Sequence, residues 1–322
     1  MPTALLLTVA GLFALVLGGE VLVKGAVGIA RKAQISSLLI GVVIVGLGTS
    51  MPELVTSIEA VLMGTPDLAW GNIVGSNIAN ALLILGVSAL VAPIVLSGGR
   101  FMRDPMFGLI ASFALLFVAL GELGSPVVGV LMLVLLVGYL AYALRQEREP
   151  KRMEPGIADT PESGDDVAAG APKSWTKPLL LTGGGLIALI VGGQMLVAGA
   201  IDLARFFGMS EALIGLTVVA VGTSFPELVT SVVAARRGEP EVAFGNVAGS
   251  NLFNLLLIGG ITMVMAPEPF PRELVVFDLY LMVGAAAALA GLVFFVGQVS
   301  RRSGFLLLAT YAGFAAFHIA AA

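Results

Sequence analysis

The sequence predicts an all-α polytopic membrane protein with ten transmembrane helices, arranged as two inverted five-helix repeats. Three observations lead to this fold class: the composition, the division of the chain into apolar stretches, and an internal repeat. Of the 322 residues, 58% are hydrophobic and 12% are charged. Soluble proteins carry about 25% charged residues, so this chain has too few charges to cover a surface that faces water.

Ten apolar stretches follow one another along the chain. A membrane-spanning helix needs about 20 apolar residues, and each stretch is close to that length or longer. Because lipid offers no hydrogen-bond partners, the backbone of such a stretch must be paired within a helix. A membrane β-barrel would instead show short alternating segments. The expected helices span residues 3–30, 36–63, 67–92, 104–121, 126–145, 178–204, 211–236, 241–266, 273–297 and 301–321.

The basic residues between these stretches predict the orientation in the membrane. Of the 17 Lys and Arg residues, 14 lie in one set of alternating loops, whereas Arg205 and Arg272 lie in the opposite set and Lys24 lies inside the first helix. Cytoplasmic loops are enriched in Lys and Arg. We therefore expect a multi-pass protein of the cell membrane with both termini outside.

A polar segment divides the chain into two halves. Residues 146–177 are rich in charged residues, Pro and Gly, a composition typical of a flexible, solvated linker. We expect a first five-helix repeat over residues 1–145, a cytoplasmic linker over 146–177, and a second, inverted repeat over 178–322. The linker is too short for a folded sensor domain, so we interpret it as a tether.

The two halves match at a constant offset of 174 residues. Between Gly48–Asn80 and Gly222–Asn254, 19 of 33 positions are identical, including the motifs GTS-x-PELVTS and GN-x-x-GSN-x-x-N. An odd number of helices in each half inverts the second copy. Inverted repeats are typical of secondary transporters, whose sites lie near the midplane where the repeats meet. A channel or an enzyme can also be duplicated, so the repeat alone leaves the function open.

Glu53 and Glu227 lie in the middle of the second and seventh expected helices. A carboxylate at this depth costs roughly 2.5–3.5 kcal/mol on insertion scales, so it marks a functional site by default. The alternative is a glutamate that only fixes helix packing by a hydrogen bond. Pro52 and Pro226 precede the two acids and remove a helical hydrogen bond. We therefore expect both helices to be broken beside the acids.

Small polar residues surround these positions and supply further oxygen atoms. Thr49, Ser50, Thr223 and Ser224 precede the prolines. In the third and eighth helices, polar residues recur at i, i+4 and i+8 and so follow one helix face: Asn72, Ser76 and Asn80, repeated as Asn246, Ser250 and Asn254. Oxygen ligands without nitrogen or sulfur suit Ca²⁺ or Na⁺ rather than Zn²⁺ or copper. The pattern predicts a midplane cation site.

Several function classes are excluded by composition. There is no Cys and only one His, His318, which argues against thiol and histidine chemistry and against an intramembrane enzyme. The net charge of -4 gives no basic field for nucleic acid. We expect no cofactor. Glu20 and Lys24, spaced i, i+4, are expected to pair within the first helix, and His318 is expected at the membrane interface.

The paired motifs resemble the two alpha repeats of the Ca²⁺/cation antiporter superfamily, and most of all its prokaryotic sodium/calcium exchanger branch. The resemblance covers essentially the whole chain. It implies antiport of Na⁺ and Ca²⁺ by alternating access at one central site, with the two ions and the lipid bilayer as partners and no obligate protein partner. By position, it makes the following residues candidate ligands: Glu53, Glu227, Thr49, Thr223, Ser50, Ser224, Ser76, Ser250, Asn80 and Asn254, with Gly46 and Ala220 contributing backbone carbonyls.

One residue departs from the branch pattern. Sodium/calcium exchangers often carry Asp at the position of Asn254, and this chain has Asn in both halves. A proton-coupled exchanger of Ca²⁺ or another divalent cation is an alternative function. That branch usually shows G-N-x-x-E, however, and here Gly75 and Gly249 stand in place of the glutamates. A cation channel, whose pore the same oxygen cage would line, is a third alternative.

Overall fold

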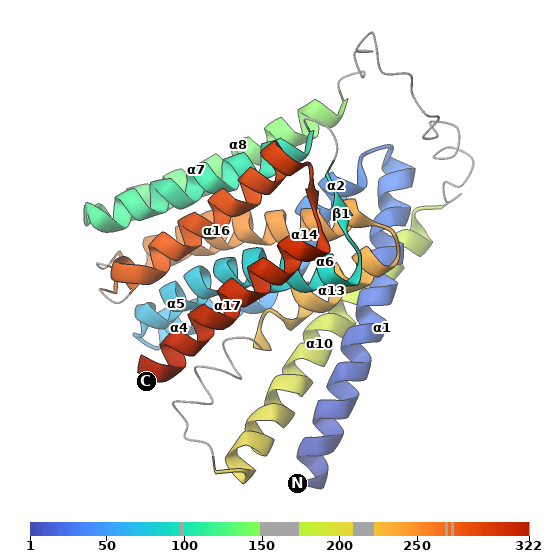
Figure 1. Ribbon diagram of the computed structural model, residues 1–322, viewed down its shortest axis with the longest axis horizontal. Coiled ribbons are helices and arrows are strands. Elements are labelled where there is room, and N and C mark those ends of the chain that lie inside the picture. The colour runs from blue at the N-terminus through green and yellow to red at the C-terminus, as the bar shows by residue number, and fades with distance from the viewer. Residues whose placement is uncertain (97–99, 149–173, 209–221, 268–269, 272–273, 322) are drawn as a thin grey trace.

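The computed structural model describes residues 1–96, 100–148, 174–208, 222–267, 270–271 and 274–321, and these residues are mostly helical (Figure 1). The exception is a short ribbon in which β1 (Ile94–Val95) pairs antiparallel with β2 (Gln298–Val299). The ribbon joins the end of the third membrane helix of the first half to the start of the last helix of the second half. The expected fold class, an all-α polytopic membrane protein, is confirmed.

Within the described residues, eight helices are long and apolar enough to cross a membrane, and a bent pair of helices makes a ninth span. The remaining expected stretch, 211–236, is described only from Gly222 onward. The ends of the other expected stretches differ from the observed helices by only a few residues. Most of the expected linker, residues 149–173, also lies outside the described part of the chain.

The first half contains five spans in sequence order. The second span consists of several short segments and bends by 41° between its two parts, and the third contains a π-helical segment. The elements are α1 (Pro2–Ala33), then α2 (Ser37–Ile40), η1 (Gly41–Gly46), α3 (Leu47–Thr49) and α4 (Met51–Leu62), then α5 (Pro66–Ile78), η2 (Ala79–Ile84) and α6 (Leu85–Val91), and finally α7 (Arg100–Leu120) and α8 (Pro126–Arg148).

The second half repeats this order. Its π-helical segment η4 lies 174 residues after η2, at the equivalent place in the repeat. The elements are α10 (Thr176–Phe206), α13 (Phe225–Arg236), then α14 (Pro240–Leu252), η4 (Phe253–Ile258) and α15 (Gly259–Met265), then η5 (Leu274–Asp278), α16 (Leu279–Gly291) and η6 (Leu292–Val296), and finally α17 (Arg301–Ala321).

The equivalent helices α1 and α10 lie side by side and run antiparallel (Figure 1). Gly11 of α1 faces Leu196, whereas Gly25, two heptads further on, faces Thr182. Contacts that move backward along α10 as they move forward along α1 demonstrate the inversion of the two repeats directly. The close approach requires glycine, because a Cβ atom on Gly25 would stand 2.5 Å from the Thr182 backbone nitrogen.

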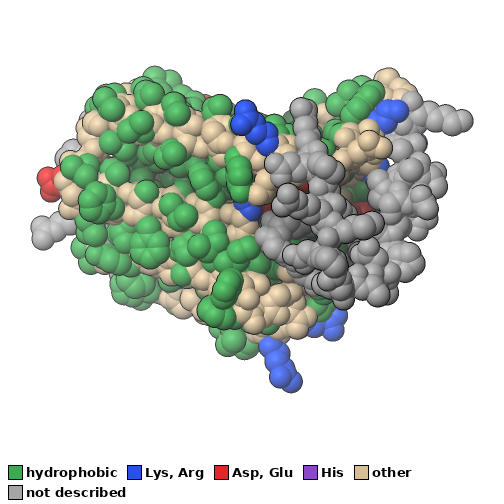
Figure 2. Space-filling model, turned by 90° about the horizontal axis from the view of Figure 1, so that it is seen from above, with side chains coloured by type: hydrophobic (Ala, Val, Ile, Leu, Met, Phe, Trp, Pro, Cys, Tyr) green, Lys and Arg blue, Asp and Glu red, His purple; other side chains and the backbone are tan. Residues whose placement is uncertain are grey.

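The third spans of the two halves form the centre of the bundle. The Pro66–Val91 and Pro240–Met265 helices are 78% and 83% buried, against 11% for the last helix, α17. Outer faces carry large exposed apolar side chains, and Figure 2 shows hydrophobic groups over most of the face in view. This reversal of the pattern of soluble proteins is expected for a protein solvated by lipid.

Candidate ion-binding site

A serine interrupts the helix just before each of the two buried glutamates. Ser50 and Ser224 leave the helical path, with ψ angles of 3° and 6°. Glu53 and Glu227 consequently stand in the first turn of the helices that follow, α4 and α13. Unpaired N–H groups and the helix dipole favour a negative charge at this place. Both glutamate side chains are 1% exposed.

The prolines begin new helices rather than bending continuous ones. Pro52 and Pro226 occupy the first turn of α4 and α13, where a missing N–H costs nothing. The second span therefore has a break at Ser50. In the second half the residues before Gly222 lie outside the described ranges, so the equivalent break is seen only from its second side.

Glu53 meets residues from three membrane helices. Its Oε1 accepts a hydrogen bond from the Ser224 hydroxyl at 3.1 Å, and the Ser224 Oγ also lies 3.5 Å from the Ser76 Oγ. The three side chains come from α4, from the start of α13 and from α5. One predicted ligand of the second repeat thus lies directly on the acid of the first.

The second group of predicted ligands forms around Thr49. Its hydroxyl oxygen lies 3.0 Å from the Val45 carbonyl, 3.1 Å from the Asn246 Oδ1 and 3.5 Å from the Ser250 Oγ. The Ser250 hydroxyl donates to the Gly46 carbonyl at 3.2 Å. Residues predicted from both repeats are therefore brought together here.

Asn72 and Asn246 hold the acidic helices in place. Asn72 Nδ2 donates to the Glu53 carbonyl at 3.1 Å and to the Ser57 hydroxyl at 3.0 Å. Asn246 Nδ2 makes the equivalent bonds in the second repeat, to the Glu227 carbonyl at 3.1 Å and to the Ser231 hydroxyl at 2.9 Å. Sequence reasoning missed Ser57 and Ser231, although their identity in both halves was a usable signal.

Several buried oxygen atoms of the predicted residues have no hydrogen-bond partner in the described part of the chain. A buried acceptor without a donor is costly, and a cation is one group that satisfies it. The oxygens converge from both repeats on the broken helices and on the π-helical segments. They are Ser50 Oγ, Glu53 Oε2, Asn80 Oδ1, Thr223 Oγ1, both carboxylate oxygens of Glu227, and Asn254 Oδ1.

Asn80 and Asn254 lie inside the π-helical segments η2 and η4. A π-helical turn is rare and is found frequently at functional sites, because the extra residue redirects side chains. Its appearance at equivalent places in both repeats points to such a role. The predicted carbonyl of Ala220 lies outside the described residues.

Two further buried acids occupy equivalent positions, since 104 and 278 differ by the repeat offset. Asp104 accepts hydrogen bonds from Arg103 and Tyr139, and Asp278 lies 2.8 Å from His318 Nε2. His318 thus has a partner on a neighbouring helix. Both acids are already neutralised by a local partner, which separates them from Glu53 and Glu227.

Glu20 does not pair with Lys24, as expected from their spacing. It accepts instead from Arg237, in the turn between α13 and α14. The helical spacing brings Glu20 and Lys24 close, but a partner from another element takes the carboxylate.

The chain matches the sequence profile of the family described as sodium/calcium exchanger protein, over residues 3–145 and 177–320. Among individual relatives, the inner membrane protein YrbG of Escherichia coli is 35% identical, over 83% of this chain and 81% of its own length. The sodium/calcium exchanger MaX1 of Methanosarcina acetivorans is 29% identical, over 96% of each chain.

The fold is also similar to a solved structure. The sodium-calcium exchanger NCX_Mj, soaked with 10 mM Na⁺ and zero Ca²⁺, superposes with a TM-score of 0.80 at 28% sequence identity. The match covers 96% of this chain and 97% of that one.

Proposed function

This chain belongs to the sodium/calcium exchanger protein family, and from that premise we propose how it exchanges Na⁺ for Ca²⁺. The antiport runs through a single central site between the two repeats. Na⁺ and Ca²⁺ occupy this site in turn, and it opens to one side of the membrane at a time. Both ions are substrates of the transporter.

The observation that carries this proposal is the pair of glutamates at the helix breaks. Both are buried, both have carboxylate oxygens without a donor among the described residues, and both are surrounded by hydroxyl and amide oxygens of the two repeats. Carboxylate, hydroxyl and amide oxygens are the ligands of hard cations such as Ca²⁺.

The proposed ligands fall into two groups. The first surrounds Glu53, on the evidence of its bond from Ser224 and the nearby Ser76. The second surrounds Glu227, on the evidence of the contacts among Thr49, Ser250 and the Gly46 carbonyl. The full proposed set is Glu53, Glu227, Thr49, Thr223, Ser50, Ser224, Ser76, Ser250, Asn80 and Asn254, with the carbonyls of Gly46 and Ala220.

The formal charge of this set favours one Ca²⁺ over a larger charge load. Two ionised glutamates carry a charge of -2, which one Ca²⁺ neutralises and three Na⁺ would exceed by one. Within the described residues there is no group of three or more His, Cys, Asp or Glu side chains that could hold a metal ion. Hydroxyl and amide groups must therefore complete the coordination.

We also propose the domain organisation and orientation from the sequence. Residues 1–145 and 178–322 form the inverted repeats, and residues 146–177 form a cytoplasmic tether. The family profile leaves out residues 146–176, which supports a role outside the conserved transport unit. The asymmetry of Lys and Arg supports termini that face outward.

Ca²⁺ uptake into proteoliposomes under imposed Na⁺, K⁺ and H⁺ gradients tests the function. We expect an outward Na⁺ gradient alone to drive uptake, with saturation at a single site and competitive inhibition by external Na⁺. Uptake driven by a pH gradient without Na⁺ would contradict the proposal. Uptake that continues without any counter-ion would indicate a channel.

A further inference from the structure

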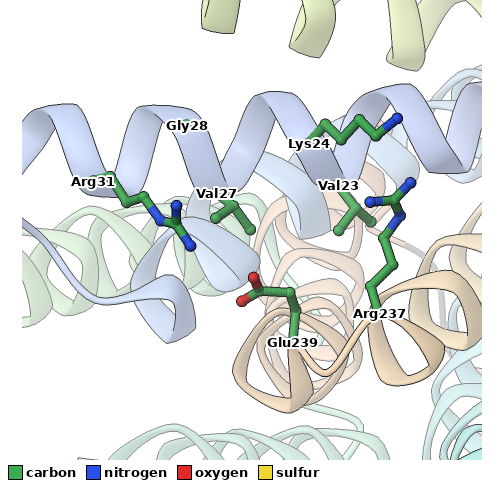
Figure 3. A pocket seen from close by; sticks show the side chains of 7 residues that line it. All are labelled: Val23, Lys24, Val27, Gly28, Arg31, Arg237 and Glu239. Atoms are coloured by element: carbon green, nitrogen blue, oxygen red, sulfur yellow. The ribbon is translucent and has the colours of Figure 1, made fainter. Parts of the chain in front are cut away.

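A second pocket lies between α1 and the turn that joins α13 to α14, away from the central ion site. It encloses about 280 Å³ and is lined by Val23, Lys24, Val27, Gly28, Arg31, Arg237 and Glu239 (Figure 3). None of these residues belongs to the proposed ion ligands. The pocket lies at the end of the protein that we propose to be cytoplasmic.

The charged lining of this pocket is predominantly positive. Lys24 and Arg31 are seven residues apart on α1, so they project from the same helix face, and Arg237 faces them from the turn (Figure 3). Against these three cations stands one lining carboxylate, Glu239. Arg237 is already paired with Glu20, whereas Lys24 makes no hydrogen bond or ion pair with the described residues.

The second repeat shows that the fold does not require these charges. At the offset of 174 residues, Lys24 corresponds to Ala198, Arg237 to Met63 and Glu239 to Thr65. Only Arg31 has a charged equivalent, Arg205. The general enrichment of basic residues in cytoplasmic loops also leaves Lys24 unexplained, because it lies inside α1, more than two turns before that helix ends at Ala33.

We propose that this pocket binds a phosphate group. Arg and Lys side chains are the usual protein donors to phosphate, and two of the three cations here have no competing hydrogen-bonded carboxylate among the described residues. The volume accommodates a phosphate together with a small polar substituent. The phosphate of an anionic phospholipid headgroup and free inorganic phosphate share this chemistry, and anionic lipids are concentrated in the cytoplasmic leaflet.

The single acid in the pocket is compatible with an anion. Burial raises the pKa of Glu239, and neighbouring Glu241 raises it further, while Arg31 and Arg237 act in the opposite direction. A phosphate beside Glu239 meets a carboxyl that takes up a proton more readily than a free one does. The acid therefore opposes the bound anion less than its formal charge suggests.

A ligand at this place would connect α1 with the helices of the ion site. The turn carrying Arg237 and Glu239 joins α13, which holds Glu227, to α14, which holds Asn246 and Ser250. Binding that favours one arrangement of α1 against this turn changes the ion affinity by the same factor with which the ions change phosphate binding.

Lipid retention by the purified full chain tests the proposal without measuring transport, so its outcome is independent of the exchange mechanism. The protein is titrated with phosphatidylglycerol in neutral detergent, and bound lipid is counted by native mass spectrometry, with phosphatidylcholine as the reference lipid. We expect Lys24→Ala and Arg31→Gln each to weaken phosphatidylglycerol binding by about tenfold, the loss of one charge-assisted contact.

Arg236→Gln is the matched control, because Arg236 is exposed beside Arg237 but does not line the pocket. It should change binding by less than about twofold. Lys24→Ala introduces the residue that the other repeat carries, so the fold should tolerate it. If that variant nevertheless fails to fold, Arg31→Gln decides the question alone.

A second arm distinguishes the two sources of phosphate. Thermal unfolding of the lipid-free protein is followed with potassium phosphate against potassium chloride at equal ionic strength. Protection by phosphate that Lys24→Ala removes, without selective retention of phosphatidylglycerol, assigns the pocket to a soluble anion. Equal lipid retention by the native chain and both variants, together with no protection by phosphate, would overturn the proposal.

Discussion

At the scale of single residues, Glu53 and Glu227 dominate the proposed site. Each stands at the start of a helix, buried, with its main-chain carbonyl held by an asparagine of the neighbouring span. The asparagine bonds position the acidic helix and leave the carboxylates directed to other partners. Charge and position are therefore provided by different side chains, and substitutions separate the two roles.

We expect Glu53→Gln or Glu227→Gln to reduce Ca²⁺ transport at least about a hundredfold while leaving the protein folded. Each variant keeps the size of the side chain and removes half of the formal charge that compensates Ca²⁺ in a medium of low dielectric constant. Initial rates of Na⁺-dependent Ca²⁺ uptake into proteoliposomes provide the measurement. Near-normal uptake by either variant, with the same size-exclusion profile as the native chain, would remove that glutamate from the site.

Asn254→Asp tests the most unusual residue of the proposed ligand set. A third carboxylate at this position should raise the apparent affinity for Ca²⁺ by about tenfold or more, because a charge pair near 4 Å is worth up to about 4 kcal/mol at an effective dielectric constant of 20. Asn254→Leu, which keeps the volume but removes the oxygen, should lower the affinity instead. If ⁴⁵Ca²⁺ binding is unchanged in both variants, Asn254 does not line the site.

At the scale of the elements, the helix breaks and the glycine contacts organise the protein. Ser50 and Ser224 end one helix and let another begin at the acid. The π-helical segments η2 and η4 hold Asn80 and Asn254 at equivalent places. Glycines on α1 and α10 let these two long helices approach each other closely. Such backbone approach is a common means of helix association in lipid, where the hydrophobic effect no longer drives packing.

Gly185→Ala should destabilise the protein by about 1–3 kcal/mol, the usual cost of overpacking. A Cβ atom at Gly185 would lie 2.5 Å from the Leu22 backbone nitrogen, and backbone cannot move aside as a side chain can. The neighbouring Gly184→Ala is the control, because nothing in the described chain lies within 4 Å of a Cβ atom there. Thermal unfolding in detergent compares the two, and equal midpoints would argue against a close α1–α10 contact.

At the scale of the whole molecule, two repeats of opposite orientation share one site. The hydrogen bond from Ser224 to Glu53, and that from Ser250 to the Gly46 carbonyl, both cross from one repeat to the other. Neither half contains a complete set of ligands, so movement of one repeat against the other changes access to the ions. The net charge that moves with the ions then follows from the two glutamates.

An interior-positive membrane potential should accelerate Na⁺-dependent Ca²⁺ uptake into proteoliposomes. If three Na⁺ leave for each Ca²⁺ that enters, one net positive charge moves outward. This movement is worth about 2.3 kcal/mol per 100 mV, or about fiftyfold in an equilibrium gradient. A K⁺ and valinomycin clamp sets the potential. Uptake that does not respond to potential would indicate two Na⁺ per Ca²⁺.

Deletion of residues 154–170 from the polar linker should leave exchange within about twofold of the native rate. The segment is solvated and contains no group of oxygen ligands that resembles the central motifs. Uptake by the deletion variant, normalised to the amount of folded protein, gives the answer. A complete loss of transport in a folded variant would show that the linker couples the repeats rather than merely joining them.

The amino-acid sequence by itself determined the membrane fold, the repeat and the identity of the two central acids. Apolar length decides whether a helix can span lipid, and an acid repeated at equivalent depth has few explanations other than function. The expected ends of most helices differ from the observed ends by only a few residues for the same reason, since polar residues mark where lipid ends.

The tertiary structure alone decided which of the polar residues meet. Helical spacing placed Asn72, Ser76 and Asn80 on one face, but only the packing shows that Asn72 holds the Glu53 backbone, whereas Ser76 lies beside Ser224. The same limit explains Glu20, whose partner proved to be Arg237 rather than Lys24. Spacing along a helix reports which side chains share a face, while the choice among partners depends on contacts between segments far apart in the sequence.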